Sequence, residues 1–352
     1  MTELINIAVV GAGLIGIAHI QRITESPESQ LCAIVDPASN TQAIARKYDV
    51  PVYDSLEKLF ESQTPDGIIL ATPNQFHVTQ TLKCLEQKIP VLVEKPVAQS
   101  IEEGKLLLEK VKQTGAKVLV GHHRAYSSII ENALEILQEG VIGKPVTVMG
   151  SALFLKPDSY FIDGVWRTKK GGGPILLNLI HEIGNLRSLL GEIVSVQAIT
   201  SNAIRNYEVE DTCAITLRFL SGTIGTFILS DTASSAKSWE QTSKENKSYP
   251  NYEDEDCYHI AGTEGSLSIP TMRIKHYPNH NNRSWWTPFE CTTKASKNTD
   301  PLESQLRHFC ALIRNEEEPR VSVKDGLQNL MVIDAIVKAS ESGTKENVEI
   351  LI

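Results

Sequence analysis

The chain has 352 residues, a formal net charge of -9, 41% hydrophobic residues and 22% charged residues. This length is enough for about two domains that each bury a core. The basic residues are dispersed in an acidic chain, which argues against a nucleic-acid partner. No apolar run approaches the ~20 residues that span a bilayer, which argues against a membrane partner.

The cysteines and histidines show no spacing typical of a disulfide framework or a metal site. The six cysteines include no CxxC pair. Neither His122-His123 nor the pair His276 and His280 joins a cysteine or carboxylate in a zinc pattern. We therefore expect reduced thiols, a cytoplasmic location and no bound metal.

Strands and helices alternate over the first third of the chain. We expect strands at residues 5–10, 31–35, 52–53, 67–71, 91–94 and 117–121. Helices are expected at residues 14–23, 41–48 and 76–87. A capping box at Asp54 and Glu57 predicts the start of another helix, and one at Ser100 and Glu103 predicts a helix that ends at Gly115. This order predicts an α/β Rossmann domain, with a doubly wound parallel sheet, over residues 1–123.

The turn after the first strand carries the spacing Gly11-x-Gly13-x-x-Gly16. The first glycine permits a tight turn, the second leaves room for a pyrophosphate, and the third lets the next helix pack closely. The amides at the start of that helix, including those of Leu14 and Ile15, would hold the phosphates. The pattern predicts a dinucleotide site and not a secretory signal, because an acidic residue and no cation precede the apolar run.

Asp36 follows the second strand, 20 residues after Gly16. A carboxylate there accepts hydrogen bonds from a free ribose diol and repels a phosphate at the 2' position. The three residues after Asp36 supply no arginine to pair with that phosphate, and Arg46 is the alternative cation further along. We therefore expect NAD and not NADP.

Strands dominate the remainder of the chain. They are expected at residues 146–154, 194–201, 212–219, 223–230, 258–261, 266–269, 273–277 and 348–351. Helices are expected from Ser128 to Gly140 and at residues 175–190, 302–314 and 324–340, and residues 233–255 are expected to form a long polar loop. Residues 124–352 thus predict an α+β domain with a large, mostly antiparallel open sheet and helices on one face.

Two segments of the first domain, residues 71–77 after the fourth strand and residues 94–96 after the fifth, lie at the edge where open parallel sheets bind ligands. Lys95, fixed by the next proline, would be able to polarise a substrate hydroxyl or carbonyl, and the alternative is a solvated lysine paired with Glu94. The expected cofactor contacts from these segments are Ala71, Thr72, Pro73, Asn74, His77, Glu94 and Lys95.

A third segment is the helix after Gly171-Gly172-Gly173-Pro174. Asn178, His181 and Asn185 share one face of this otherwise apolar helix. Histidine suits proton transfer near neutral pH, and the alternative is a hydrogen-bonded core histidine.

These motifs together resemble the glucose-fructose oxidoreductase and inositol dehydrogenase (Gfo/Idh/MocA) family over essentially the whole chain. The resemblance is carried by GAGLIG, Asp36, ATPNQFH, EKP, Trp166-Arg167 and GGGP followed by His181. It implies NAD(P)-dependent oxidation of a secondary alcohol, often on a sugar or cyclitol, by a homodimer or homotetramer that associates through the open sheet. It also implies that Lys95 and His181 are catalytic and that Trp166 and Arg167 reach the cofactor.

The sequence departs from the family pattern beside the histidine. Leu177 stands where the family usually has an aspartate, Asn178 follows one step later, and Asn185 stands at another common aspartate position. An amide is able to orient a hydroxyl but cannot accept a proton for catalysis. Proton removal is therefore assigned to His181.

We expect Lys95 to hydrogen-bond the substrate oxygen, His181 to remove its proton and Asn178 to fix the hydroxyl, while hydride passes to the nicotinamide. Alternatives are an imine or enone reductase, an oxidoreductase that retains its NAD, and a non-catalytic NAD-binding redox sensor. Arg124 is a further expected cofactor contact. Further expected substrate contacts, suited to a polyol, are His122, Tyr160, Asp163 and Trp239.

Overall fold

The computed structural model describes residues 3–39, 41–295 and 299–351. Its contacts divide the chain into two compact units, one of residues 1–126 with 301–330 and the other of residues 127–300 with 331–352. The sequence-based division assigned everything after residue 123 to the second domain. Residues 301–330 instead return to the first unit.

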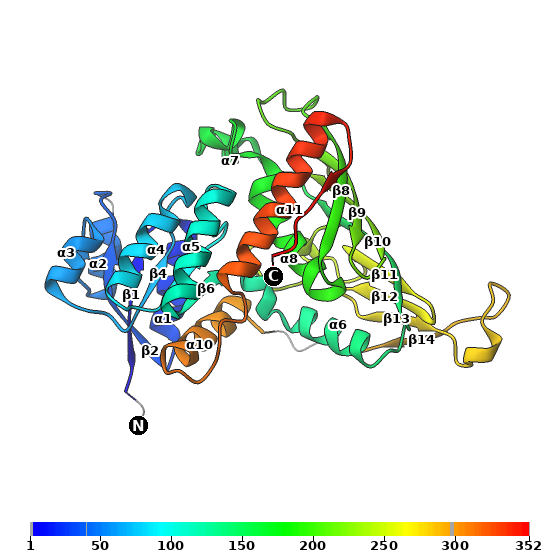
Figure 1. The fold of residues 1–352 in the computed structure, drawn as a ribbon, viewed down its shortest axis with the longest axis horizontal. Coiled ribbons are helices and arrows are strands. Elements are labelled where there is room, and N and C mark those ends of the chain that lie inside the picture. The colour runs from blue at the N-terminus through cyan, green and yellow to red at the C-terminus, as the bar shows by residue number, and fades with distance from the viewer. Residues whose placement is uncertain (1–2, 40, 296–298, 352) are drawn as a thin grey trace. The chain divides into compact units, whose positions relative to one another are not determined.

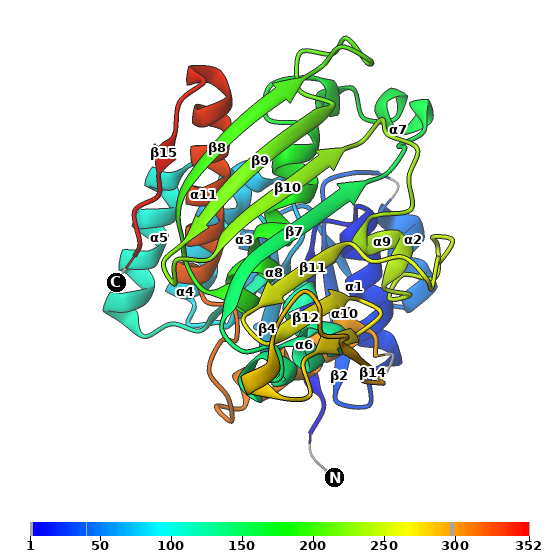
Figure 2. The same cartoon turned by 90° about the vertical axis from the view of Figure 1, so that its right-hand side faces the viewer.

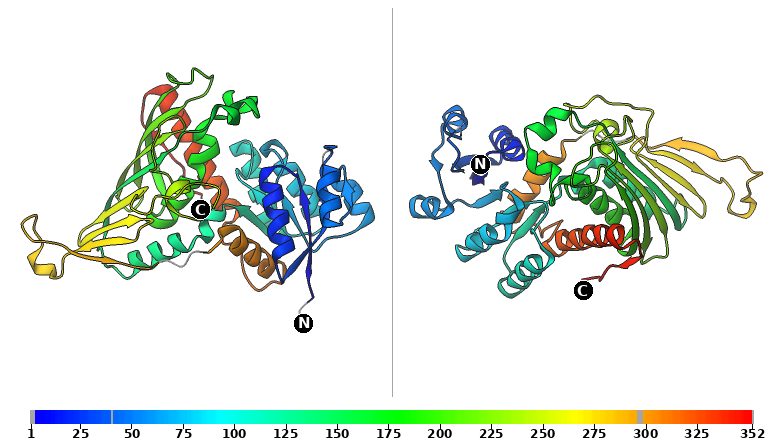
Figure 3. Two further views of the ribbon diagram at one scale, coloured as in Figure 1. Left: turned by 180° about the vertical axis from the view of Figure 1, so that it is seen from behind. Right: turned by 90° about the horizontal axis from the view of Figure 1, so that it is seen from above.

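The first unit contains the expected parallel six-stranded sheet, in the order β3-β2-β1-β4-β5-β6 (Figure 1). Helix α1 packs beside α10, and α4 packs beside α5. The two pairs cover opposite faces of this sheet (Figure 3). The strands are β1 (Ile5–Val10), β2 (Ser29–Val35), β3 (Val52–Tyr53), β4 (Gly67–Leu70), β5 (Val91–Glu94) and β6 (Val118–Gly121). The helices are α1 (Leu14–Glu25), α2 (Thr41–Tyr48), α3 (Leu56–Ser62), α4 (His77–Glu86), α5 (Ile101–Thr114), α10 (Pro301–Ile313) and the start of α11 (Val323–Ser342), with short helices η1 (Asn74–Phe76) and η2 (His123–Tyr126).

The core of this unit explains why α10 returns to it. Ile7, Ile69 and Phe309 are each fully buried in one apolar cluster. A side chain at Gly67 would lie 3.0 Å from the Phe309 ring, so the glycine at the start of β4 lets α10 pack closely. Burying a side chain of this size contributes roughly 1.5–3 kcal/mol.

The helix caps follow the sequence with shifts of one residue. Ser100 accepts a 3.2 Å hydrogen bond from the Glu103 amide, and Gly115 ends α5 with a φ of 66°, as expected. The other two helices are capped by Ser55 and Ser127, one residue from the expected positions. Each capping serine has extended backbone angles, which let its hydroxyl reach the first amides of the helix.

The second unit contains a nine-stranded sheet in the order β14-β13-β12-β11-β7-β10-β9-β8-β15 (Figure 2). All neighbours are antiparallel except β7 and β10. The strands are β7 (Pro145–Leu153), β8 (Ile193–Ser201), β9 (Thr212–Phe219), β10 (Ile224–Ser230), β11 (Tyr258–Gly262), β12 (Gly265–Ile269), β13 (Arg273–His276), β14 (Glu290–Thr293) and β15 (Glu346–Asn347). The helices are α6 (Ser128–Gln138), α7 (Asp158–Ile162), η3 (Val165–Thr168), η4 (Ile175–Leu179), α8 (Ile180–Leu190), α9 (Trp239–Thr242), η5 (His280–Asn282) and the rest of α11.

Three expectations for this unit are wrong in detail. Strand β14 was not expected, because its four residues are all exposed and give no apolar signal. The last strand pairs through Glu346 and Asn347 and not through residues 348–351, although the Val348 amide still donates to the Val194 carbonyl at 2.9 Å. The loop at residues 233–255 contains one short helix, α9.

One face of the nine-stranded sheet is open. Figures 2 and 3 show α6 and α8 on the other face. Met149, Ile199 and Ile224 on the open face are 56%, 75% and 50% exposed. In β9, by contrast, Ile215 and Leu217 point to the covered face and are buried. Along the described chain, no helix has the length and apolar character needed to cross a membrane.

Candidate functional site

The glycine turn between β1 and α1 is shaped to accept a pyrophosphate. A Cβ at Gly16 would lie 2.0 Å from the Gly11 carbonyl oxygen, so this glycine is required for close packing of the helix on the turn. A Cβ at Gly13 would meet nothing within 4 Å, so this glycine leaves open space at the helix start. No described side chain caps α1, and the amides of Leu14 and Ile15 remain available to an anion.

The loop after β4 lies against the same turn. A Cβ at Gly11, where φ is +93°, would lie 2.7 Å from the Ala71 carbonyl oxygen. The Ala71 amide donates to the Val10 carbonyl at 2.7 Å, and Pro73 precedes the short helix η1 that contains Asn74. The loops after β1 and β4 therefore adjoin, as expected for the two walls of a dinucleotide site.

Asp36 is held rigidly at the end of β2. Its Oδ2 accepts a 2.7 Å hydrogen bond from the Ala12 amide, and its Oδ1 accepts a 2.8 Å bond from the Ala38 amide. Asp36, Asp54 and Lys58 line a hollow of about 250 Å³. Within it, Lys58 donates a 2.6 Å hydrogen bond to Asp54. Two carboxylates and one already paired cation form a poor site for a 2'-phosphate.

Lys95 follows β5 on a backbone that Glu94 fixes. The Glu94 carboxylate is 4% exposed, accepts a 2.9 Å hydrogen bond from Nε2 of His19 through Oε1, and accepts the Lys95 amide at 3.2 Å through Oε2. Burial favours a higher pKa for Glu94, but the hydrogen bond and charge of His19, with the charges of His123 and Lys95, outweigh burial and lower it. The carboxylate therefore stays ionised and anchors Lys95.

The helix that carries His181 begins as a π-helix. Residues of η4 form this turn, and α8 continues it, whereas the sequence predicted one regular helix. Gly173 has a φ of +80°, and a Cβ there would lie 2.7 Å from Oε1 of Glu210, which accepts the Ile175 amide at 2.9 Å. Single π-turns of this kind occur frequently at functional sites. Asn178 lies in the π-turn, and His181 is 8% exposed in the first turn of α8.

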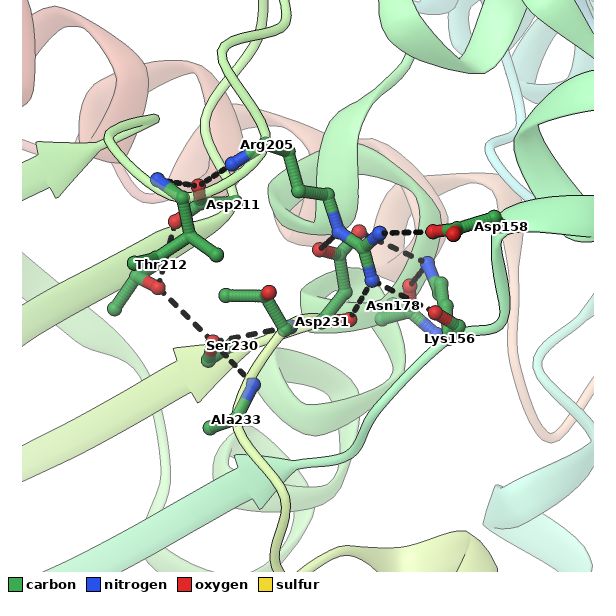
Figure 4. Close-up of polar contacts among 11 residues, drawn as sticks. Lys156, Asp158, Asn178, Arg205, Asp211, Thr212, Ser230, Asp231 and Ala233 are labelled. Carbon is green, nitrogen blue, oxygen red and sulfur yellow. Dashed lines mark hydrogen bonds and ion pairs between the residues drawn. The ribbon is translucent and has the colours of Figure 1, made fainter.

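Lys156, which the sequence analysis missed, contacts Asn178 (Figure 4). Its Nζ donates a 2.7 Å hydrogen bond to Oδ1 of Asn178 and lies 3.7 Å from Oδ2 of Asp231. The Arg205 guanidinium holds the other Asp231 oxygen at 3.0 Å. Burial lowers the pKa of Lys156 to about 8, and the charges of Arg205 and Arg167 act in the same direction, against those of Asp231 and Glu240.

Both parts of the chain match one protein family. Residues 5–122 match "Oxidoreductase family, NAD-binding Rossmann fold", and residues 135–350 match "Oxidoreductase family, C-terminal alpha/beta domain". The chain belongs to the Gfo/Idh/MocA oxidoreductase family. Its first unit is an NAD-binding Rossmann domain, and the glycine turn and Asp36 fit that cofactor.

Several relatives of this Gfo/Idh/MocA chain are named for an activity. The scyllo-inositol 2-dehydrogenase (NAD(+)) of Bacillus subtilis (strain 168) is 27% identical over 356 residues, which cover 97% of this chain and 96% of the relative. The 2,7-anhydro-N-acetylneuraminate hydratase of Escherichia coli (strain K12) is 28% identical over 229 residues, which cover 63% and 61%. The WlbA dehydrogenase from Bordetella pertussis, crystallised with NADH and UDP-GlcNAcA, matches with a TM-score of 0.79 at 21% identity over 99% of each chain, which shows a shared fold.

His77 is buried between two loops of the NAD-binding unit in this Gfo/Idh/MocA chain. It is 1% exposed, its Nδ1 lies 2.7 Å from the Pro96 carbonyl oxygen, and its Nε2 lies 2.8 Å from that of Thr72. Burial lowers the pKa of His77, although both carbonyls act to raise it. Its ring joins the loops after β4 and β5 and so positions them, and its contact with the cofactor stays a prediction. The Thr72 hydroxyl donates to Gln80 at 2.6 Å.

Two residues after β6 are also buried. His122 is 4% exposed, with its Nε2 3.2 Å from Nδ2 of Asn329, and Arg124 is 5% exposed. Burial, followed by the charge of Arg124, lowers the pKa of His123 to about 4, which keeps that ring neutral at pH 7. The sequence motifs did not reveal this burial, because it depends on packing against α11.

The remaining expected contacts divide into three groups. Arg167 stacks 3.9 Å from the centre of the Tyr160 ring, over which Lys156 also lies at 4.8 Å, so Tyr160 belongs to the Asn178 surroundings. Trp166 is 56% exposed and Asp163 is exposed. Trp239 is 2% exposed and donates from Nε1 to Glu245 at 2.7 Å, so it packs the interior of its loop, and its contact with the substrate stays a prediction.

Proposed function

We propose that this protein is an NAD-dependent dehydrogenase that oxidises a secondary hydroxyl of a sugar, cyclitol or related polyol. The match to both domains of an oxidoreductase family supports this, as does the relative named scyllo-inositol 2-dehydrogenase (NAD(+)). The observation that carries the proposal is the Glu94 anchor, because a buried ionised carboxylate fixes the backbone of Lys95 at the carboxyl end of β5.

In the proposed mechanism, Lys95 donates a hydrogen bond to the substrate oxygen and His181 accepts the hydroxyl proton. NAD, when bound, accepts hydride from the carbon that carries this hydroxyl. Loss of a positioned general base costs ~10²- to 10⁴-fold in rate. We assign the pyrophosphate to the glycine turn and the adenosine ribose to Asp36, whose charge selects NAD over NADP.

The decisive experiment is an NADH-formation assay with a panel of polyols. The panel contains scyllo-inositol, myo-inositol, glucosides and hydroxy acids, each with NAD and with NADP. Oxidation of at least one sugar or cyclitol, reduced at least 100-fold in Lys95→Ala and in His181→Ala, supports the proposal. Near-normal turnover by either variant overturns the assigned roles.

A second candidate is a reaction without net redox change in which the protein retains its cofactor. The relative named 2,7-anhydro-N-acetylneuraminate hydratase favours this candidate, because addition of water yields no free NADH. Nucleotide that remains bound through gel filtration, together with substrate conversion but no NADH release, would distinguish it. A redox sensor would bind NAD and convert no compound of the panel.

We also propose that the open face of the nine-stranded sheet joins copies of this chain in a homodimer or homotetramer. Met149, Ile199, Ile224 and Ile228 expose apolar surface there. Sedimentation of the wild type and of Ile199→Lys tests this. A wild-type monomer, or an unchanged oligomer in the variant, would count against this interface.

A further inference from the structure

The contact between Lys156 and Asn178 has a defined direction. An ammonium group has three donors and no acceptor. The Asn178 amide must therefore turn its oxygen, and not its nitrogen, toward Nζ of Lys156 at 2.7 Å. The hydrogen-bond network thus assigns the orientation of this amide, whose oxygen and nitrogen have nearly the same shape.

The two N–H groups of the Asn178 amide are left for another acceptor. Within the described parts of the chain, no residue accepts a hydrogen bond from Nδ2 of Asn178. The side chain is half-buried in the π-turn, three residues before His181, and thus about one turn from the proposed base. Asn178 is placed to donate to a ligand oxygen and cannot accept a hydroxyl proton.

The charges around Lys156 explain why its short contact is with an amide. Asp231 follows β10, and its Oδ1 accepts a 3.0 Å hydrogen bond from Nε of Arg205, while its Oδ2 lies 3.7 Å from Nζ of Lys156. Arg205 also donates to the Lys156 carbonyl at 2.8 Å, which fixes the lysine backbone (Figure 4). The lysine side chain is 11% exposed, so water does not readily replace Asn178 as its partner.

We propose that Lys156 is a positioning residue that holds Asn178 as a hydrogen-bond donor to an oxygen of the substrate. This rests on the proposed dehydrogenase function and refines it, because Asn178 then recognises an acceptor oxygen and leaves proton removal to His181. An aspartate at position 178 would keep an acceptor for Lys156 but would have no donor for the substrate.

A double-mutant cycle on kcat/KM tests this, with scyllo-inositol or the best substrate of the panel. Lys156→Met is expected to lose roughly tenfold and Asn178→Ala at least as much, as for one lost hydrogen bond. The double variant is expected to fall no further than Asn178→Ala, because Lys156 acts through Asn178. Multiplicative losses would overturn the proposal.

Two further variants separate positioning from stability. Asn178→Asp retains the contact with Lys156, and is expected to lose as much activity as Asn178→Ala because the donors are gone. Lys237→Met is the matched control, because Lys237 is 51% exposed and pairs with Glu255 at the surface. Wild-type activity in Asn178→Asp overturns the proposal even if Lys156→Met fails to fold.

The pH profile gives a readout that a merely structural lysine would not change. Above pH 8, Lys156 loses its proton, the neutral amine is able to accept a bond, and the orientation of Asn178 is no longer fixed. Asp231 and Glu240 oppose this loss, whereas Arg205 and Arg167 favour it. We expect kcat/KM to fall above pH 8 in the wild type and not in Lys156→Met, and the same fall in both overturns the proposal.

The substrate panel separates failure of the proposed function from failure of the proposed role of Lys156. If the wild type oxidises a polyol but the cycle is multiplicative, only the role of Lys156 fails. If no polyol is oxidised, the proposed function fails and the role of Lys156 fails with it.

Discussion

The Glu94 carboxylate accepts a 2.9 Å hydrogen bond from His19, which joins the end of β5 to helix α1 inside the NAD-binding unit. Both side chains are almost fully buried. The same carboxylate accepts the Lys95 amide, so one ionised group connects the first helix of the Rossmann fold to the proposed catalytic lysine.

Removal of this carboxylate is expected to destabilise the protein strongly. Glu94→Ala leaves His19 and the Lys95 amide without their acceptor, which costs about 3 kcal/mol in the free energy of unfolding. Urea denaturation followed by circular dichroism measures this loss. The control is Glu57→Ala, because Glu57 pairs with Lys83 on the surface and its loss costs about 1 kcal/mol or less. Equal losses in the two variants would show that the buried pair has no special role.

The pKa of His123 predicts a loss of stability in mild acid. Its folded pKa of about 4 lies below the ordinary value of 6.5, so between these values the unfolded chain binds a proton that the folded chain does not. Stability therefore falls as the pH falls through this window, by about 2 kcal/mol between pH 7 and pH 5 from this group. Urea denaturation at both pH values should show a smaller fall in the free energy of unfolding for His123→Gln than for the wild type. An equal fall in both would contradict the lowered pKa of His123.

Asp36→Asn tests the choice of coenzyme without a change of side-chain shape. The amide retains one acceptor oxygen, but the negative charge that repels a 2'-phosphate is gone. We expect the ratio of kcat/KM with NADP to kcat/KM with NAD to rise at least roughly tenfold, which corresponds to ~1.4 kcal/mol. Asp334→Asn, which changes a surface pair with Lys338, serves as the matched control and should leave the ratio unchanged. An unchanged ratio in Asp36→Asn would mean that shape and not charge excludes NADP.

The sequence predicted those parts of the fold that depend on local patterns. Apolar strands, the glycine turn and the Ser100 cap are each encoded within a few neighbouring residues. The return of α10 was not predicted, because Phe309 packs against Gly67 from 242 positions further along the chain. Periodicity identifies an apolar helix face but not the unit that will bury it.

The candidate site divides in the same way. Gly13, Asp36, Lys95 and His181 stand in motifs whose spacing indicates their chemistry. Lys156 follows an ordinary strand with no motif, and its importance depends on a contact with Asn178 that only the tertiary structure creates. The π-turn that presents Asn178 also has no sequence signal, because its residues fit a regular apolar helix equally well.

Gly13 and Gly16 provide a matched pair in which one fingerprint glycine serves the ligand and the other serves the fold. At Gly13 the φ of -73° suits any residue and a new Cβ meets nothing within 4 Å, so Gly13→Ala should leave the melting temperature unchanged. The new methyl group occupies the space assigned to the pyrophosphate, so NAD affinity should fall at least roughly tenfold, the equivalent of ~1.4 kcal/mol.

At Gly16 the substitution should affect the stability of the fold first and NAD affinity only as a consequence. A Cβ there lies 2.0 Å from the Gly11 carbonyl oxygen, so the helix must move away from the turn, and Gly16→Ala should lower the melting temperature before any ligand is added. Overpacking of this kind typically costs about 1–3 kcal/mol. Calorimetric titration with NAD and thermal unfolding of both variants measure the two effects separately. If Gly13→Ala bound NAD as tightly as the wild type, the pyrophosphate would have to bind away from the start of α1, and the cofactor assignment built on this turn would be wrong.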